Sequence, residues 1–112
     1  MTDLTPALID GRPVTAADVT EVRSPFDGRV LGSVPTLGTD HVDEAVAVAL
    51  ERHRGGALPA HQRAEILDRA AVLLTERRDE FAQSISGEAA KPITTATVEA
   101  TRAVDTLRFA AA

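Results

Sequence analysis

The sequence predicts an α+β fold that is mostly α, with a short N-terminal β-hairpin region over residues 8–34 followed by three amphipathic helices. Two Asp-Gly turn signals between short apolar runs indicate the β region. An apolar spacing of three and four residues through the rest of the chain indicates the helices. Three Phe and no Trp or Tyr occur among 112 residues, so we expect one small core built from close contacts between aliphatic side chains.

The β region is predicted from Asp10-Gly11 and Asp27-Gly28, because both residue types tolerate the positive φ of tight turns. Pro13, Pro25 and Pro35 lack a main-chain N–H, which confines these strands to edges or strand ends. Such a thin unit is not expected to be stable without a partner surface.

The first helix is predicted over residues 39–54. Thr39 or Asp40 is expected to cap its start, and Gly55-Gly56 to end it. Its apolar stripe consists of Val42, Ala45, Val46, Ala49 and Leu50.

The second and third helices are predicted over residues 59–86 and 92–112. Gly87 is expected to stop the former, and Pro92 to occupy the first position of the latter, where its missing N–H costs nothing. The stripe of the second helix is Leu67, Ala70, Ala71, Leu74, Phe81 and Ile85, and that of the third is Ile93, Ala96, Ala100, Ala103, Val104, Leu107 and Ala111. No capping residue follows the third helix, so we expect a longer parent protein.

Composition argues against several classes of protein. The net charge is −5 and no face collects basic residues, so no nucleic-acid partner is expected. No apolar run has membrane length, and the start MTDLTPALIDG lacks the features of a signal peptide, which makes the cytoplasm the expected location. The absence of cysteine excludes disulfides, thiolate metal sites and a Cys nucleophile from these residues.

Three groups of polar residues are candidate sites. His41, His53 and His61 are spaced by twelve and eight residues, which does not bring them to one helix face, so we interpret them as surface residues rather than metal ligands. The charged run ERRDE at 76–80 is interpreted as a solvated helix face rather than a partner patch. The hydroxyl run Thr94, Thr95 and Thr97 has no base within reach in the sequence and no glycine elbow, which leaves nucleophilic catalysis with little support.

Lys91 is the remaining candidate. It precedes a predicted helix N-terminus, a place where anions bind, but no glycine-rich phosphate motif lies beside it. We therefore interpret the stretch GEAAKP as a joint between helices rather than a phosphate site. The sequence assigns no catalytic, cofactor-binding or metal-binding residue within this chain.

Five segments, in order, resemble the N-terminal segment of the NAD(P)-dependent aldehyde dehydrogenase superfamily. The similarity covers residues 8–112, and the segments are LIDGRPV, SPFDGRVLGSVP, DEAVAVAL, PAHQRAEILDRAAVLLTERRDEFAQSISGEAAKP and TVEATRAVDTLRFAA. The resemblance implies that residues 1–112 form the N-terminal part of the cofactor-binding domain of an α/β enzyme. That enzyme would oxidise an aldehyde to an acid through a Cys nucleophile, with NAD or NADP as cofactor. The Cys, the Glu general base, the oxyanion Asn and the cofactor-binding turn would all come from later sequence.

Two positions bear on this resemblance. Ala90 stands where the family usually has the glycine of Gly-Lys-Pro, so the turn must form without that residue or pass its role to Gly87. Some members bind a monovalent cation near the joint, and Glu88 with carbonyls of Val22 or Arg23 would be the matching ligands; an ion pair of Glu88 with a basic side chain is the alternative.

Two functions remain open. The chain is expected to be a fragment of an aldehyde dehydrogenase that is inactive alone and whose partner is the remainder of such an enzyme, or a second copy bound through exposed apolar helix faces. The alternative is an independent helical interaction module that binds a full-length relative. The aldehyde substrate is not specified, although the last helix leans toward branches acting on small hydroxylated or phosphorylated aldehydes.

Overall fold

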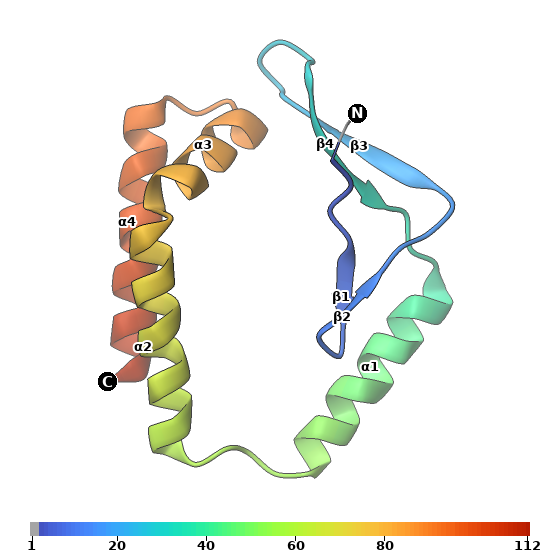
Figure 1. Cartoon of the computed structure of the whole chain (residues 1–112), viewed down its shortest axis with the longest axis vertical. Coiled ribbons are helices and arrows are strands. Elements are labelled where there is room, and N and C mark those ends of the chain that lie inside the picture. Colours follow the sequence, from blue (N-terminus) through green and yellow to red (C-terminus); the bar gives the residue numbers. More distant parts are fainter. Residues whose placement is uncertain (1–2) are drawn as a thin grey trace. The chain divides into compact units, whose positions relative to one another are not determined.

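The computed structural model describes residues 3–112, which form two compact units, one reaching to Ala57 and one comprising Leu58–Ala112 (Figure 1). The first unit contains four strands and a helix: β1 (Ala7–Ile9), β2 (Arg12–Val14), β3 (Val19–Arg23), β4 (Val30–Pro35) and α1 (Thr39–Arg54). The second contains three helices: α2 (Ala60–Glu76), α3 (Arg78–Ala89) and α4 (Ile93–Ala111). The predicted class, mostly α with an N-terminal β-hairpin region, is confirmed.

The strands form two separate antiparallel hairpins, β1–β2 and β3–β4. In the first turn Asp10 and Gly11 both have positive φ, 53° and 70°, as the Asp-Gly signal predicts. In the second loop Gly28 has a φ of 74°, and the Asp27 carboxylate accepts the N–H of Arg29 at 3.1 Å. Both turns therefore depend on the Asp-Gly pairs that are identified in the sequence.

Two contacts extend these hairpins. Residues 3–5 lie along the outer edge of β4, where Thr5 N–H donates to the Ser33 carbonyl at 2.9 Å and Ser33 N–H donates to the Asp3 carbonyl at 3.1 Å. Helix α1 is linked to the first turn by Arg52, whose Nη2 lies 3.0 Å from Oδ1 of Asp10. The β1–β2 hairpin and α1 are thus joined by an ion pair between residues far apart in the sequence.

The start of α1 differs from the prediction. The N-cap residue is Gly38, while Thr39 and Asp40 lie inside the helix and neither side chain caps it. Instead, the Gly38 N–H donates to Nδ1 of His41 at 3.3 Å. The C-terminal prediction is confirmed, because the helix ends at Gly55 and Gly56 follows with a φ of 90°.

The predicted helix over 59–86 is divided at Arg77, whose φ of −103° and ψ of 15° leave the helical region. No Pro or Gly explains this bend. Thr75 Oγ1 donates to the Ala71 carbonyl at 2.8 Å, a back-bond that tends to bend helices, and Asp79 and Glu80 place negative charge in the first turn of α3. The apolar spacing continues across Arg77, so the sequence pattern predicts one uninterrupted helix there.

The core of the second unit lies where α4 packs against α2 and α3. Ala82, Ala96 and Ala100 are buried at the centre, with Ile85 packed against them, and Ala71 and Val104 are also buried. These alanines permit the close helix contacts that the aromatic-poor composition predicts. Three members of the stripes predicted for this unit are exposed instead: Phe81, Ile93 and Ala103.

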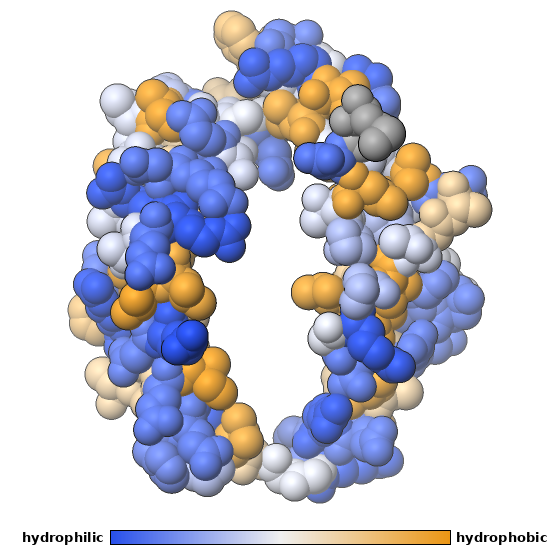
Figure 2. All heavy atoms as spheres, in the orientation of Figure 1, coloured by the Kyte–Doolittle hydropathy of each residue, from blue (hydrophilic) through white to orange (hydrophobic). Residues whose placement is uncertain are grey.

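Large apolar side chains remain at the surface of both units, as the orange atoms in Figure 2 show. Among them are Leu8, Val46 and Phe109, exposed by 71%, 60% and 82%. No helix within residues 3–112 is long and apolar enough to cross a membrane.

Candidate functional site

The joint between α3 and α4 is made by Ala90, which adopts the left-handed conformation with a φ of 52° and a ψ of 32°. Gly87, expected to stop the helix, lies inside α3, which continues to Ala89. The hydroxyl of Ser86 donates to the carbonyl of Lys91 at 2.7 Å and holds the chain as it turns. Ala90 thus takes the glycine-like conformation itself, although an L-residue is disfavoured there.

Lys91 lies in this joint with its ammonium group paired. Its Nζ is 2.6 Å from Oε1 of Glu99, two turns along α4, and both side chains are less than half exposed. Pro92 is the N-cap residue and α4 begins at Ile93, one position later than expected. Because Glu99 already compensates the charge of Lys91, the geometry favours a structural joint over an anion site.

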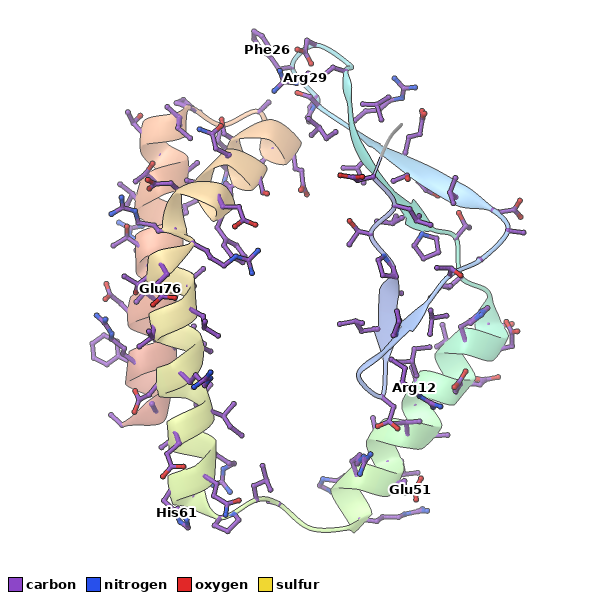
Figure 3. The ribbon with its side chains drawn as sticks, viewed as in Figure 1. Arg12, Phe26, Arg29, Glu51, His61 and Glu76 are labelled. Carbon is purple, nitrogen blue, oxygen red and sulfur yellow. The ribbon has the colours of Figure 1, made fainter. Side chains whose placement is uncertain are left out.

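His41 and His53 lie on α1, and His61 lies on α2. His41 accepts the hydrogen bond of Gly38 and lies 3.3 Å from Oδ1 of Asp40. His53 and His61 are exposed, and Figure 3 shows His61 in the first turn of α2. Over residues 3–112 no three His, Cys, Asp or Glu side chains gather in a way that could hold a metal ion.

The charged run at 76–80 forms local ion pairs at the bend. Arg77 Nε donates to Glu80 at 2.9 Å, Arg78 pairs with Asp79 at 2.8 Å, and the Arg77 guanidinium lies 5.4 Å from the ring centre of Phe81. The hydrogen bond from Arg77 lowers the pKa of the Glu80 carboxyl, and the same bond raises the pKa of Arg77. These exposed pairs lie at the start of α3, and the interpretation as a solvated face rather than a partner patch stays a prediction.

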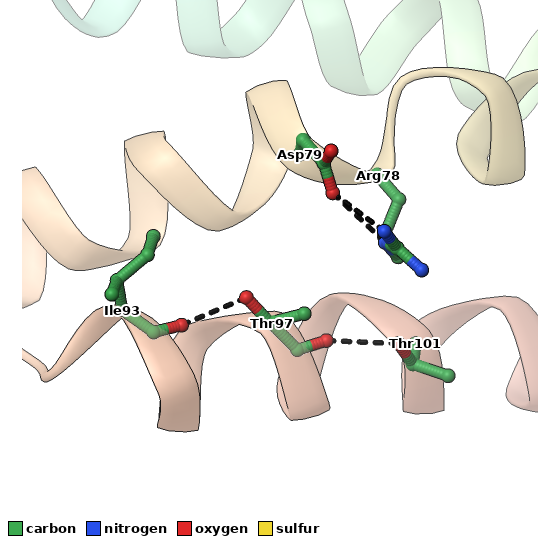
Figure 4. A network of polar contacts seen from close by, with 5 residues as sticks. All are labelled: Arg78, Asp79, Ile93, Thr97 and Thr101. Carbon is green, nitrogen blue, oxygen red and sulfur yellow. Dashed lines mark hydrogen bonds and ion pairs between the residues drawn. The ribbon is translucent and has the colours of Figure 1, made fainter.

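The hydroxyls of Thr97 and Thr101 are bonded to the backbone of α4 itself (Figure 4). Thr97 Oγ1 donates to the Ile93 carbonyl at 2.8 Å, and Thr101 Oγ1 donates to the Thr97 carbonyl at 2.9 Å. Thr94 and Thr95 are exposed. The geometry therefore adds no support for a nucleophile in this run.

Glu88, the candidate cation ligand, is exposed near the end of α3. Val22 and Arg23 belong to the other compact unit, and the Arg23 guanidinium donates to the Gly28 carbonyl at 2.9 Å. The cation site stays a prediction.

Each unit carries an apolar groove. In the first unit a groove of about 390 Å³ lies between β1 and α1 and is lined almost entirely by apolar side chains, with His41 at one end; its lining includes Leu8, Ile9, Leu37, Val42, Ala45 and Val46. This groove contains most of the predicted apolar stripe of α1, and no residue of α1 is buried.

The groove of the second unit has a volume of about 290 Å³ and is lined by Ala70, Leu73, Leu74, Arg77, Phe81 and Leu107. Leu73 lies outside the predicted stripe. The apolar spacing of the sequence gives no signal for the place of Leu73 in this groove. The two units thus provide scaffold elements with structural ion pairs and open apolar faces.

Comparison with known proteins identifies the class of enzyme to which this scaffold belongs. The family model described as the aldehyde dehydrogenase family matches residues 14–112, which is most of the chain. The chain belongs to the aldehyde dehydrogenase family, and it corresponds to an N-terminal segment of it.

Among curated relatives, the aldehyde-dehydrogenase-like protein y4uC of Sinorhizobium fredii is 42% identical over 95 residues. That match covers 80% of this chain and 18% of the relative, so the chain spans about a fifth of its length.

Solved structures of aldehyde dehydrogenases also match the chain over a part of their length. An NAD-dependent aldehyde dehydrogenase from Sinorhizobium meliloti matches with a TM-score of 0.91 and 30% identity, over 98% of this chain and 23% of that one. An NADP-dependent glyceraldehyde-3-phosphate dehydrogenase from Bacillus halodurans, solved with NADP, matches with a TM-score of 0.90 and 29% identity, over 99% and 24%.

Proposed function

We propose that this chain is the N-terminal part of an NAD(P)-dependent aldehyde dehydrogenase and is inactive alone. The parent reaction is the oxidation of an aldehyde to a carboxylic acid. One observation carries the proposal: the family match covers residues 14–112, yet these 112 residues contain no cysteine that could form a thiohemiacetal with an aldehyde.

The cofactor would be bound by the remainder of the parent enzyme. The chain contains no glycine-rich dinucleotide motif, and its one lysine at a helix start is paired with Glu99. NAD and NADP are both in keeping with the relatives, because one matched structure is described as NAD-dependent and another as NADP-dependent. The glyceraldehyde-3-phosphate dehydrogenase among them is in line with a small phosphorylated aldehyde as substrate.

An activity assay tests the proposal directly. The purified chain is incubated with a panel of aldehydes and NAD+ or NADP+, and the reduced cofactor is followed by its absorbance. No reduction is expected above a preparation from cells that carry an empty vector. Turnover of any aldehyde by the purified chain above that control would overturn the proposal.

The partner of the chain is proposed to be the remainder of an aldehyde dehydrogenase. The grooves at α1 and α2 expose apolar side chains that a further layer would cover. A relative from which the matching N-terminal segment has been deleted is expected to gain activity when the chain is added. A chain in which Val46→Glu places a charge in the groove of the first unit is expected to restore less activity.

The same exposed grooves favour a second candidate, an independent module that binds a full-length relative. The coding DNA distinguishes the two. Continuation into a Cys-bearing aldehyde dehydrogenase sequence in any frame supports the fragment, whereas a separate promoter downstream supports the module. A cytoplasmic location is part of both proposals, and cell fractionation tests it.

A further inference from the structure

Strand β3 has one edge that no described strand covers. Among the strands of residues 3–112, its only neighbour in the sheet is β4. Two hydrogen bonds that flank β3 show which of its main-chain groups face β4. Thr36 N–H donates to the Asp18 carbonyl and Ser24 N–H donates to the Arg29 carbonyl, both at 2.9 Å, so the main-chain groups of Asp18 and Ser24 face β4. Main-chain groups alternate between the two edges of a strand. The N–H and C=O groups of Val19, Glu21 and Arg23 therefore point to the uncovered edge.

The register of the hairpin gives the same result independently. Glu21 lies opposite Ser33, and both main-chain groups of Ser33 are used on the far side of β4 by Asp3 and Thr5. The pair of Glu21 and Ser33 is therefore a non-hydrogen-bonded pair, which leaves the N–H and C=O of Glu21 on the outer edge of β3. The two edges of this hairpin differ, because residues 3–5 cover β4 while nothing described in the first unit covers β3.

The side chains at this edge are self-complementary. Glu21 and Arg23 are two residues apart, so they lie on one face of the strand, where they form an ion pair with each other. Both are about half exposed. In an antiparallel pair of identical strands centred on Val22, each Glu21 would lie directly opposite the Arg23 of the other copy.

We propose that two copies of this chain pair through β3, antiparallel about a twofold axis at Val22, to form a four-stranded sheet. Glu21 and Arg23 of the two copies occupy the hydrogen-bonded positions, where their outward N–H and C=O groups exchange main-chain hydrogen bonds. The half-buried Val22 residues meet at the intervening position, where side chains of paired strands approach most closely.

Charge selects this register over its neighbours. Centring the pair on Glu21 places Glu21 opposite Glu21, and centring it on Arg23 places Arg23 opposite Arg23, and like charges directly opposite are unfavourable. Only the arrangement about Val22 places opposite charges at both hydrogen-bonded positions. Charged residues usually protect an exposed strand edge from pairing, so the competing interpretation is that Glu21 and Arg23 keep this edge single.

Complementary charge variants separate the two interpretations. Sedimentation velocity over a concentration series is expected to show self-association of the wild-type chain, from 11.8 kDa toward twice that mass. Glu21→Arg and Arg23→Glu each place like charges in both cross-strand positions and are expected to weaken association by about tenfold or more. An equal mixture of the two variants restores opposite charges, and so does the double variant Glu21→Arg with Arg23→Glu.

Recovery in the mixture and in the double variant supports the proposal, since a chain that merely misfolds would not recover in this pattern. Association through the apolar groove is separated by Val46→Glu, which is expected to leave pairing through β3 unchanged. A wild-type chain that stays monomeric, single variants that associate as tightly as wild type, or a mixture that stays dissociated would each overturn the proposal. None of these readouts depends on aldehyde oxidation.

Discussion

Lys91 and Glu99 form an ion pair at the joint of the second unit, with Nζ 2.6 Å from Oε1. The pair spans from the residue before Pro92 to the second turn of α4, so it links the joint to the helix that follows it. This ion pair and the hydrogen bond from Ser86 to the Lys91 carbonyl give Lys91 a structural role at the start of the helix.

Replacing Lys91 is therefore expected to leave anion affinity unchanged. Lys91→Ala should show the same thermal shift with inorganic phosphate or a nucleotide as the wild-type chain, and should lose less than about 1 kcal/mol of stability, as partly exposed pairs do. Glu99→Gln is the matched control, since it removes the same pair and keeps the lysine. A phosphate-induced shift that disappears in Lys91→Ala alone would restore the binding-site interpretation.

Ala90→Gly is expected to stabilise the second unit. Ala90 has a φ of 52°, a conformation that costs an L-residue about 1–2 kcal/mol, whereas glycine enters it freely. The greater freedom of glycine in the unfolded chain offsets part of this gain, which leaves a net increase of about 0.5–1 kcal/mol in the free energy of unfolding. Urea denaturation measures it.

Ala89→Gly provides the control for that measurement, because Ala89 is the last residue of α3 and is also exposed. Glycine there is expected to lower stability by up to about 1 kcal/mol. If both substitutions lower the urea midpoint equally, the left-handed conformation of Ala90 is not a source of strain.

The joint is a place where the sequence predicts only part of the structure. The Asp-Gly turns, the end of α1 and the alanine-rich packing of α4 are local or periodic features, and the structure confirms them. For the joint, the sequence leaves two alternatives. Ala90 stands where the family usually has glycine, so the turn forms either without a glycine at that position or with Gly87 in its role. The bend at Arg77 and the pair of Lys91 with Glu99 depend on tertiary packing and side-chain reach, which apolar spacing does not encode.

The alanine contacts of α4 predict a sharp contrast between two substitutions. Ala96 is fully buried against Ala82 and Ala100, so Ala96→Leu forces a larger side chain into a packed contact and is expected to cost about 1–3 kcal/mol. Ala103→Leu, on the exposed side of the same helix, is expected to change stability by less than about 0.5 kcal/mol. Thermal melts followed by circular dichroism compare them, and equal losses would contradict this placement of the core.

The ion pair at the bend predicts a weak dependence of stability on pH. Because the pKa of Glu80 is lowered in the folded chain, its contribution is present above the pKa of the unfolded state and is lost as pH falls through the folded value. The melting temperature should therefore fall more steeply for wild type than for Glu80→Gln below about pH 4.3, the usual pKa of glutamate. Glu76→Gln, also exposed and one residue before Arg77, should behave as wild type. Indistinguishable curves for wild type and Glu80→Gln would contradict the shift.

The open groove of the first unit predicts a marginal, partly molten chain that binds hydrophobic dyes. Leu8, Val42 and Val46 are each more than half exposed around this groove, and full burial of one such side chain is worth about 1.5–3 kcal/mol. A domain has a total stability of only about 5–15 kcal/mol, so leaving several of them uncovered removes much of the margin. We expect a broad thermal transition and binding of ANS. Val46→Glu should reduce the dye signal, whereas Ala47→Glu, exposed on α1 and outside the groove, should not. A sharp, cooperative transition of a monomer without dye binding would instead show that the chain is self-sufficient, and would favour the independent module over the fragment.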